Sequence, residues 1–312
     1  GGGASTTLSA SHSSDQTGWS SFFSTSSASV NTSVAGEVSL SPSLNSSIQT
    51  SASDFSTWAT SSVLASSTGR IVLLKPDGAT CTQANQCRSG ACNGTTCYTP
   101  PCGSLTTVDY SSVTYNLVNI GTQCWFSQNL NVGTKLAAGT TLPSNNSLIE
   151  KWCYDNSDAN CTTYGGLYTW AEANQLATTC NTNSCTPSSP SQGICPSGWH
   201  IPTDTEFKTL ESYLGMCAGA GAGCVDATGY RGTNQGTQLK SGGTSGFNFL
   251  LGGLRATNGS FFNLGTEGYL WSASQYSATV AWNRYFQSSE ARVNRDSFNT
   301  KASGLSVRCL KN

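Results

Sequence analysis

The chain has 312 residues, so at the usual ~150 residues per domain two or three structural units are expected. Lys and Arg total 15 and Asp and Glu total 16, which gives a formal net charge of −1, and charged residues make up only 10% of the sequence. This balance excludes a basic nucleic-acid-binding protein. No stretch approaches the ~18 consecutive apolar residues of a membrane span, so membrane insertion is not expected.

The cysteine content points to an exported protein. Fourteen cysteines accompany one Met and two His, a pattern that predicts disulfides formed outside the reducing cytosol rather than a metal or thiol enzyme. We therefore expect an extracellular, cell-surface location and no cofactor. No signal peptide opens the sequence, so Gly1 is interpreted either as the end left by processing or as an artificial triglycine extension.

Residues 1–75 are predicted to form a Ser/Thr-rich, all-β assembly region. Of the first 70 residues 33 are Ser or Thr, and the charged ones are Asp15, Glu37, Asp54 and Arg70. Composition alone is equally typical of a disordered, O-glycosylated stalk, but residues alternate with period two at 28–34 and 37–41, as in half-buried strands. Burial of so few large apolar side chains does not offset the conformational entropy that the backbone loses on ordering, ~1–2 kcal/mol per residue. We therefore expect identical subunits to cover this region by sheet augmentation, giving a homopolymer.

Residues 76–102 are predicted to form a small disulfide-stapled module. An apolar strand at 71–74 and a turn at 76–78 precede it. Its cysteines are separated by gaps of five, four and four residues, which does not match the paired cysteines of a zinc site. The spacing resembles the small DGxxCxxxxxCxSGxC modules of secreted proteins. Of three possible pairings, we prefer Cys81 with Cys92 and Cys87 with Cys97.

Residues 103–312 are predicted to form a loop-rich α+β domain of short, glycine-punctuated strands, without a parallel sheet. The best helical pattern covers 203–214 and begins with Thr203 or Asp204 as N-cap. The apolar face of this helix consists of Phe207, Leu210 and Leu214. A second helix is expected at 168–176.

An ordered series of motifs crosses this third region. It comprises NIGTQCW at 119–125, QNLN at 128–131, WCYDN at 152–156, YGGLYTW at 164–170, CPSGWHIPTD at 195–204, GGLR at 252–255, GYLWSAS at 268–274 and SVRCLK at 306–311. From about residue 115 to residue 312 the chain resembles the Fibrobacter succinogenes major paralogous domain. That family is similar to the C-type lectin and formylglycine-generating-enzyme fold. The resemblance implies a lectin-like fold and a secreted or surface location, and it transfers no catalytic residue.

The chain departs from the commoner family pattern at Cys124 and in two cysteine-bearing insertions. The positions of the remaining cysteines favour five further disulfides: Cys153 with Cys161, Cys195 with Cys309, Cys180 with Cys185, Cys217 with Cys224, and Cys102 with Cys124. The bond between Cys195 and Cys309 would tie the middle of the domain to its end, as in lectin-like folds. All fourteen cysteines are then used.

For each residue that could act in catalysis, the sequence favours a structural role. His200 has no nucleophile or second histidine beside it in the sequence, so a hydrogen-bonded core or turn role is preferred to a general base. The spacing of Asp204 and Glu206 fits helix capping better than a glycosidase pair. The serines at 271–274 lack the glycines of a hydrolase elbow. We expect no enzyme; an oxidative enzyme like the formylglycine-generating relatives would need reactive or copper-binding cysteines.

Sugar binding is a stronger possibility, because lectin-like folds hold sugars on exposed aromatic faces or through calcium. The proline-centred calcium tripeptides are missing, and residues 282–284 read Trp-Asn-Arg. The tryptophans inside the family motifs are interpreted as core: Trp125, Trp152, Trp170, Trp199 and Trp271. A polar loop has the residues of a cation site, but an Asp/Asn turn needs no ion: Asp155, Asn156, Asp158 and Asn160. We therefore expect no metal.

Six Asn-x-Ser/Thr sequons are candidate glycosylation sites: Asn31, Asn45, Asn93, Asn145, Asn160 and Asn258. Sugar linked to Ser or Thr in the first region is the preferred decoration. The first hypothesis for the whole chain is a secreted structural subunit of a filament or surface assembly, with residues 1–75 polymerising and the lectin-like domain displayed outward. The alternative is a monomeric cell-surface adhesin that binds polysaccharide through the last domain.

Overall fold

The computed structural model describes residues 75–137, 139, 142–144, 147–217 and 222–312, and of residues 1–74 the backbone of six short strands. The chain divides into two units, Gly1–Gly103 and Ser104–Asn312. This division lies next to the predicted boundary between residues 102 and 103. The finer division at residue 75 stays a prediction.

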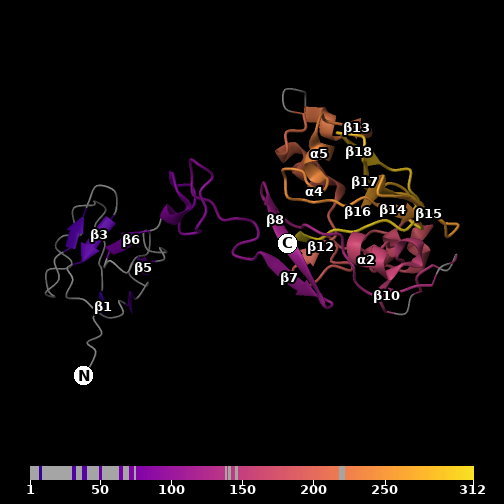
Figure 1. The fold of residues 1–312 in the computed structure, drawn as a ribbon, viewed down its shortest axis with the longest axis horizontal. Coiled ribbons are helices and arrows are strands. Elements are labelled where there is room, and N and C mark those ends of the chain that lie inside the picture. Colours follow the sequence, from indigo (N-terminus) through magenta and orange to yellow (C-terminus); the bar gives the residue numbers. More distant parts are fainter. Residues whose placement is uncertain are drawn as a thin grey trace, which may run out of the picture. The chain divides into compact units, whose positions relative to one another are not determined.

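The first unit contains a four-stranded antiparallel sheet (Figure 1). In spatial order its strands are β2 (Val30–Thr32), β3 (Glu37–Leu40), β6 (Arg70–Leu73) and β5 (Val63–Ala65). A separate parallel pair joins β1 (Thr7–Leu8) to β4 (Gln49–Thr50). β2, β3 and β6 fall where alternation or apolar residues predicted strands. The rest of the predicted assembly region lies outside the described residues.

The cysteine-rich module follows and has little regular structure, with one 3-10 turn, η3 (Ala84–Gln86). Its hydrophobic cluster consists of cysteines: Cys81, Cys87 and Cys97 are buried and Cys92 packs against them. A module this small has no other apolar core, so covalent cross-links substitute for core burial.

A five-stranded antiparallel sheet opens the second unit and also receives its end. In spatial order it consists of β12 (Trp199–His200), β19 (Leu310–Lys311), β9 (Gln123–Phe126), β8 (Val113–Ile120) and β7 (Thr107–Tyr110). β19 lies between β9 and β12 and brings the carboxyl terminus into the middle of the domain (Figure 1).

A six-stranded mixed sheet forms the other half of the unit. Its spatial order is β13 (Gly229–Arg231), β18 (Val293–Asp296), β17 (Ala281–Gln287), β16 (Glu267–Gln275), β14 (Gly252–Arg255) and β15 (Phe261–Leu264). β14 and β16 are parallel, as are β10 (Thr134–Lys135) and β11 (Glu150–Lys151). Among the described strands of this unit, parallel pairing is limited to these short contacts, and the larger sheets are antiparallel or mixed, in line with the expectation against a parallel sheet.

The helices are short and few. They are α2 (Asp158–Tyr164), α3 (Trp170–Ala173), α4 (Asp204–Tyr213) and α5 (Gln235–Leu239), with 3-10 turns η4 (Tyr154–Asn156), η5 (Thr178–Asn181) and η6 (Ala222–Val225). α4 is the helix predicted at 203–214: Thr203 is its N-cap and forms a reciprocal capping box with Glu206. α3 is shorter than the predicted 168–176, because Gln175 has a φ of +51° and ends the helix.

The main core of the second unit lies where α4 meets both sheets. Phe207 and Leu210 of α4 are buried there with Trp125 of β9 and Phe286 of β17, and Leu214 packs at the margin. Trp125 lies 5.4 Å from Phe207, measured between ring centroids. Each such buried side chain contributes roughly 1.5–3 kcal/mol. The fold is thus mostly β, with few helices and many disulfides. Among the described residues no helix has the length and apolar character that crossing a bilayer requires.

Candidate functional site

Every cysteine in the chain is disulfide-bonded, and none is free. Six defined pairs join the same cysteines as the sequence analysis preferred: Cys81 with Cys92, Cys87 with Cys97, Cys153 with Cys161, Cys180 with Cys185, Cys195 with Cys309, and Cys217 with Cys224. Cys102 and Cys124 are also disulfide-bonded. Cysteine is thus used throughout for cross-links.

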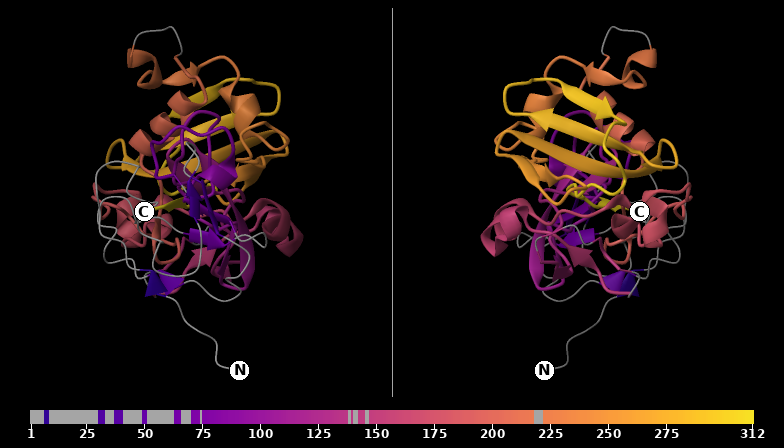
Figure 2. Two further views of the ribbon diagram at one scale, coloured as in Figure 1. Left: turned by 90° about the vertical axis from the view of Figure 1, so that its left-hand side faces the viewer. Right: turned by 90° about the vertical axis from the view of Figure 1, so that its right-hand side faces the viewer.

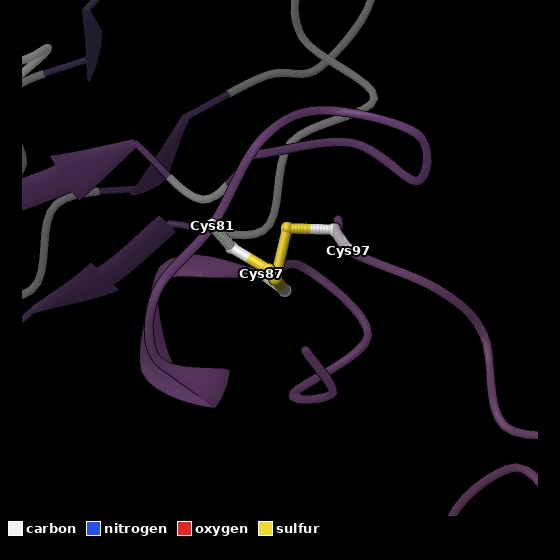
Figure 3. A group of neighbouring side chains, drawn as sticks. All are labelled: Cys81, Cys87 and Cys97. Carbon is white, nitrogen blue, oxygen red and sulfur yellow. A yellow bond between two sulfur atoms is a disulfide. The ribbon is translucent and has the colours of Figure 1, made fainter. Parts of the chain in front are cut away.

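Three sulfur atoms in the cysteine-rich module are close enough to suggest a metal site. Those of Cys81, Cys87 and Cys97 lie within 4.8 Å of one another (Figure 3). Each belongs to a disulfide, whereas a metal ligand must be a thiolate. The cluster is therefore the cross-linked core of the module, which agrees with the preference for disulfides over zinc.

His200 lies in β12 and is hydrogen-bonded at both ring nitrogens. Its Nδ1 is 2.7 Å from Oδ1 of Asn312, and its Nε2 is 2.9 Å from Oε1 of Glu206. Burial lowers the pKa of His200, but the hydrogen bonds to Glu206 and Asn312 raise it, and the net shift is upward. Burial raises the pKa of Glu206, but its bonds to His200 and Thr203 bring it below the ordinary value. With both nitrogens engaged, His200 has the structural role that the sequence suggested.

Asp204 and Glu211 of α4 are the centre of a buried charge network that the sequence analysis did not foresee. Asp204 pairs with Arg284 and Arg295 at 2.8 Å. Glu211 pairs with Arg284 at 2.5 Å and with Arg231 at 2.9 Å. Burial raises the pKa of Asp204, but the two arginines lower it to about 2. A glycosidase acid needs a raised pKa, so Asp204 is not suited to that role.

The polar loop around η4 is occupied by a lysine. Nζ of Lys135 lies 2.7 Å from the carboxylate of Asp158 and 3.3 Å from the carbonyl oxygen of Asn156. The amide of Asn160 donates to a backbone carbonyl 2.9 Å away, and Asp155 is exposed. The lysine thus supplies positive charge beside the loop where a cation was considered.

One face of the six-stranded sheet carries a row of three tyrosines and one asparagine that the sequence analysis did not predict. Tyr230 of β13 pairs with Asn294 of β18, Asn294 with Tyr285 of β17, and Tyr285 with Tyr269 of β16. We call these four residues the tyrosine row. The rings of Tyr269 and Tyr285 stack at 4.8 Å, and those of Tyr230 and Tyr285 are 6.0 Å apart. Tyr230, Tyr285 and Asn294 are half-buried.

Glu267 holds the row in place from one end of β16. Its carboxylate accepts hydrogen bonds from Tyr269 at 2.5 Å, Tyr285 at 2.7 Å and Gln287 at 3.1 Å. Burial raises the pKa of Glu267, but these bonds lower it below the ordinary value. Burial and the ionised carboxylate both raise the pKa of Tyr285. The row is thus a hydrogen-bonded array of neutral phenols around one ionised acid.

Comparison with known proteins identifies the second unit. The family model of the Fibrobacter succinogenes major domain matches residues 118–311, well over half of the chain. The chain belongs to this family. Searches of curated proteins and of solved structures found no match. The predicted family resemblance over residues 115–312 is confirmed, while its relation to the lectin fold stays a prediction. The family and the many disulfides fit a secreted or surface protein.

The tryptophans of the Fibrobacter succinogenes major domain form core and not a sugar platform. All five that lie in family motifs are at most 4% exposed: Trp125, Trp152, Trp170, Trp199 and Trp271. Trp282, outside those motifs, is half-buried and stacks on the guanidinium of Arg295 at 3.5 Å. Among the described residues of this domain, Trp282 is thus the one tryptophan that keeps partial exposure.

Three candidate glycosylation sites lie among the described side chains. Asn93 and Asn258 are exposed, and each accepts a hydrogen bond from the backbone N–H two residues later, at 3.1 and 3.0 Å. Asn160 is half-buried and its amide nitrogen is engaged. The side chains of the other three, Asn31, Asn45 and Asn145, lie outside the described residues. Glycosylation itself stays a prediction.

Proposed function

We propose that the chain is a non-enzymatic structural subunit of an extracellular filament or surface assembly. Residues 1–75 would polymerise with identical subunits through their strands, and the Fibrobacter succinogenes major domain would be displayed outward. The proposal joins two physical requirements of such a subunit: surfaces that pack together without charge repulsion, and a displayed domain that survives outside the cell.

The observation that carries the proposal is the burial of charge. Among the side chains that the structure describes, ten charged ones are buried: Glu150, Glu172, Asp204, Glu211, Arg231, Arg255, Arg284, Arg295, Lys301 and Arg308. Such residues are rarely buried in ordinary proteins. The outer surface is therefore even poorer in charge than the composition indicates. With few charged groups on the surface, electrostatic repulsion between copies is limited, which favours association.

The strand order of the first unit supplies a route for polymerisation. β2 and β5 are the outer strands of its four-stranded sheet. Outer strands present unpaired main-chain N–H and C=O groups, which can pair with a strand from another copy. The low charge of this region leaves few lysines or acids to block such pairing.

Polymerisation can be tested on the full-length chain. We expect filaments or a lattice in negative-stain micrographs and fast-sedimenting species by ultracentrifugation. Val30→Lys on β2 places a charge on an outer strand and is expected to reduce the polymer at least threefold. The matched control is Thr209→Lys on the exposed side of α4.

A full-length protein that stays monomeric, with residues 1–70 resistant to protease, would contradict the proposal. That outcome would favour the alternative, a monomeric surface adhesin. Equal loss of polymer in the Val30→Lys and Thr209→Lys variants would show that β2 is not the contact.

A further inference from the structure

The outer face of the six-stranded sheet has the chemistry of a carbohydrate-binding surface. We infer that the tyrosine row (Tyr230, Asn294, Tyr285 and Tyr269) binds an extended, neutral polysaccharide. This binding is additional to the structural role proposed above, because it uses the second unit and does not require polymerisation. The inference depends on the openness of the face, its charge, and the direction of the row.

The face is covered at one end and open at the other. Trp271, two residues after Tyr269 on the same side of β16, is fully buried and donates to the carbonyl of Tyr168 at 2.9 Å. Tyr285 and Tyr230 lie toward the other end and remain half-buried. In the right-hand view of Figure 2 the yellow strands β16, β17 and β18 are seen face-on, with no helix in front of them. The open end is thus made of phenols and amides rather than aliphatic core.

The charged groups on and around this face already have hydrogen-bond or ion-pair partners within the protein. Glu267 accepts its hydrogen bonds from the row itself, and Arg292, over the ring of Tyr230 at 5.1 Å, pairs with Glu290 at 2.7 Å. Lys240 donates to three backbone carbonyls, and the carboxylate of Asp296 accepts the N–H of Phe298. Among the described residues, the carboxylates of Glu267 and Asp296 have no cationic partner and would repel an acidic ligand, while Lys240 and Arg292 are already engaged. A neutral ligand is therefore the best match for this face.

The hydrogen-bonding capacity that remains suits hydroxyl groups. The phenol oxygens of Tyr269 and Tyr285 donate to Glu267 and keep their acceptor lone pairs. Among the described residues, the amide of Asn294 has no hydrogen-bond partner, so both its donor and acceptor groups are available. Tyrosine rings bury apolar area at small entropic cost and keep a polar end in water. Sugar rings, which have apolar C–H faces and hydroxyl edges, match this combination.

The direction of the row favours a chain over a single sugar. Tyr269 is buried at 7% exposure, and its ring stacks on that of Tyr285. The half-buried members Tyr230, Asn294 and Tyr285 occupy three successive strands, which lie about 4.8 Å apart, so the accessible part of the row crosses the sheet over roughly 10 Å. A surface of this length can contact more than one sugar unit of a polymer.

The test uses the full-length chain in affinity electrophoresis through gels that contain xylan, galactomannan, soluble starch or hydroxyethylcellulose, with alginate as the acidic comparison. We expect retardation by at least one neutral polysaccharide, unchanged by EDTA, and none by alginate. Tyr230→Ala should weaken binding at least threefold, and Tyr230→Ala with Tyr285→Ala about tenfold. Tyr285→Phe keeps the aromatic ring and should weaken polysaccharide binding less than the double alanine variant does. Tyr213→Ala, which removes an exposed tyrosine of α4, is the matched control and should bind normally.

Each other outcome overturns the inference. These are retardation by none of the neutral polysaccharides, retardation by alginate alone, and equal binding by the double variant and the wild type. Concentration-dependent self-association that Tyr230→Ala abolishes would show a second copy on this face instead. Thermal unfolding of each variant separates loss of binding from loss of fold, which is needed because Tyr230 bonds Gln287 and also contacts Tyr285 and Arg292. Filament formation is scored separately, so failure here leaves the structural proposal standing.

Discussion

At the scale of single residues, titratable groups in this chain hold structure together. His200 shows this clearly, because one side chain connects β12, the first turn of α4 through Glu206, and the terminal Asn312. Both contacts use oxygen atoms, which accept hydrogen bonds best from a ring that carries two protons. The charge of the imidazole is thus coupled to folding.

That coupling predicts a pH-dependent stability. The pKa of His200 is raised in the folded state above its ordinary 6.5, so its stabilisation is complete below about pH 6.5 and is lost as pH rises through the folded pKa. His200→Gln should therefore lower the free energy of unfolding more at about pH 5.5 than at about pH 8.5. Urea denaturation at both values measures this. His12→Gln, at the only other histidine, is the control, and a pH-independent difference for His200→Gln would contradict the coupling.

At the scale of elements, ion pairs attach α4 to the six-stranded sheet. Glu211 contacts Arg231 of β13 and Arg284 of β17, although Arg284 is 73 residues away in the sequence. Glu211 and Arg284 are at most 1% exposed. Desolvating such groups costs energy that is recovered only when every charge is paired.

Loss of one partner from this network should be severe. Glu211→Ala leaves two buried arginines with reduced compensation and is expected to cost about 3–5 kcal/mol in the free energy of unfolding. Glu290→Ala removes one partner of the surface pair with Arg292 and should change stability little. Chemical denaturation compares the two variants. Equal effects would show that the buried network does not stabilise the fold.

At the scale of the whole molecule, disulfides contribute to the free energy of unfolding according to the length of the loop that each one closes. Cys195 and Cys309 are 114 residues apart in sequence and join the middle of the second unit to its end. Cys180 and Cys185 are separated by only five residues. A longer closed loop restricts the unfolded chain more.

Removal of the two bonds should therefore have unequal effects. Replacing Cys195 and Cys309 by serine is expected to cost about 2–5 kcal/mol in the free energy of unfolding. The same change at Cys180 and Cys185 should cost less. Calorimetry of the oxidised proteins gives both values, and a larger loss at the short loop would contradict loop length as the cause.

Local signals explain the features that were predicted correctly. Thr203 and Glu206 form their capping box within one turn, so α4 is recognisable from the sequence. The cysteine spacings restrict pairing in the same way, because short separations limit which sulfurs can meet. The tyrosine row was missed because its members belong to strands as far apart in sequence as Tyr230 and Tyr285, and only register makes them neighbours.

The sequence by itself determined the family, the oxidising environment, the disulfide framework and the one well-capped helix, because motif order and short-range spacing carry that information. Only the tertiary structure decided which charges are buried, that strands such as β14 and β16 pair in parallel, and that tyrosines from three strands align on one open face. These features depend on contacts between residues tens of positions apart, and the pattern of side chains along the chain does not reveal which distant segments become neighbours.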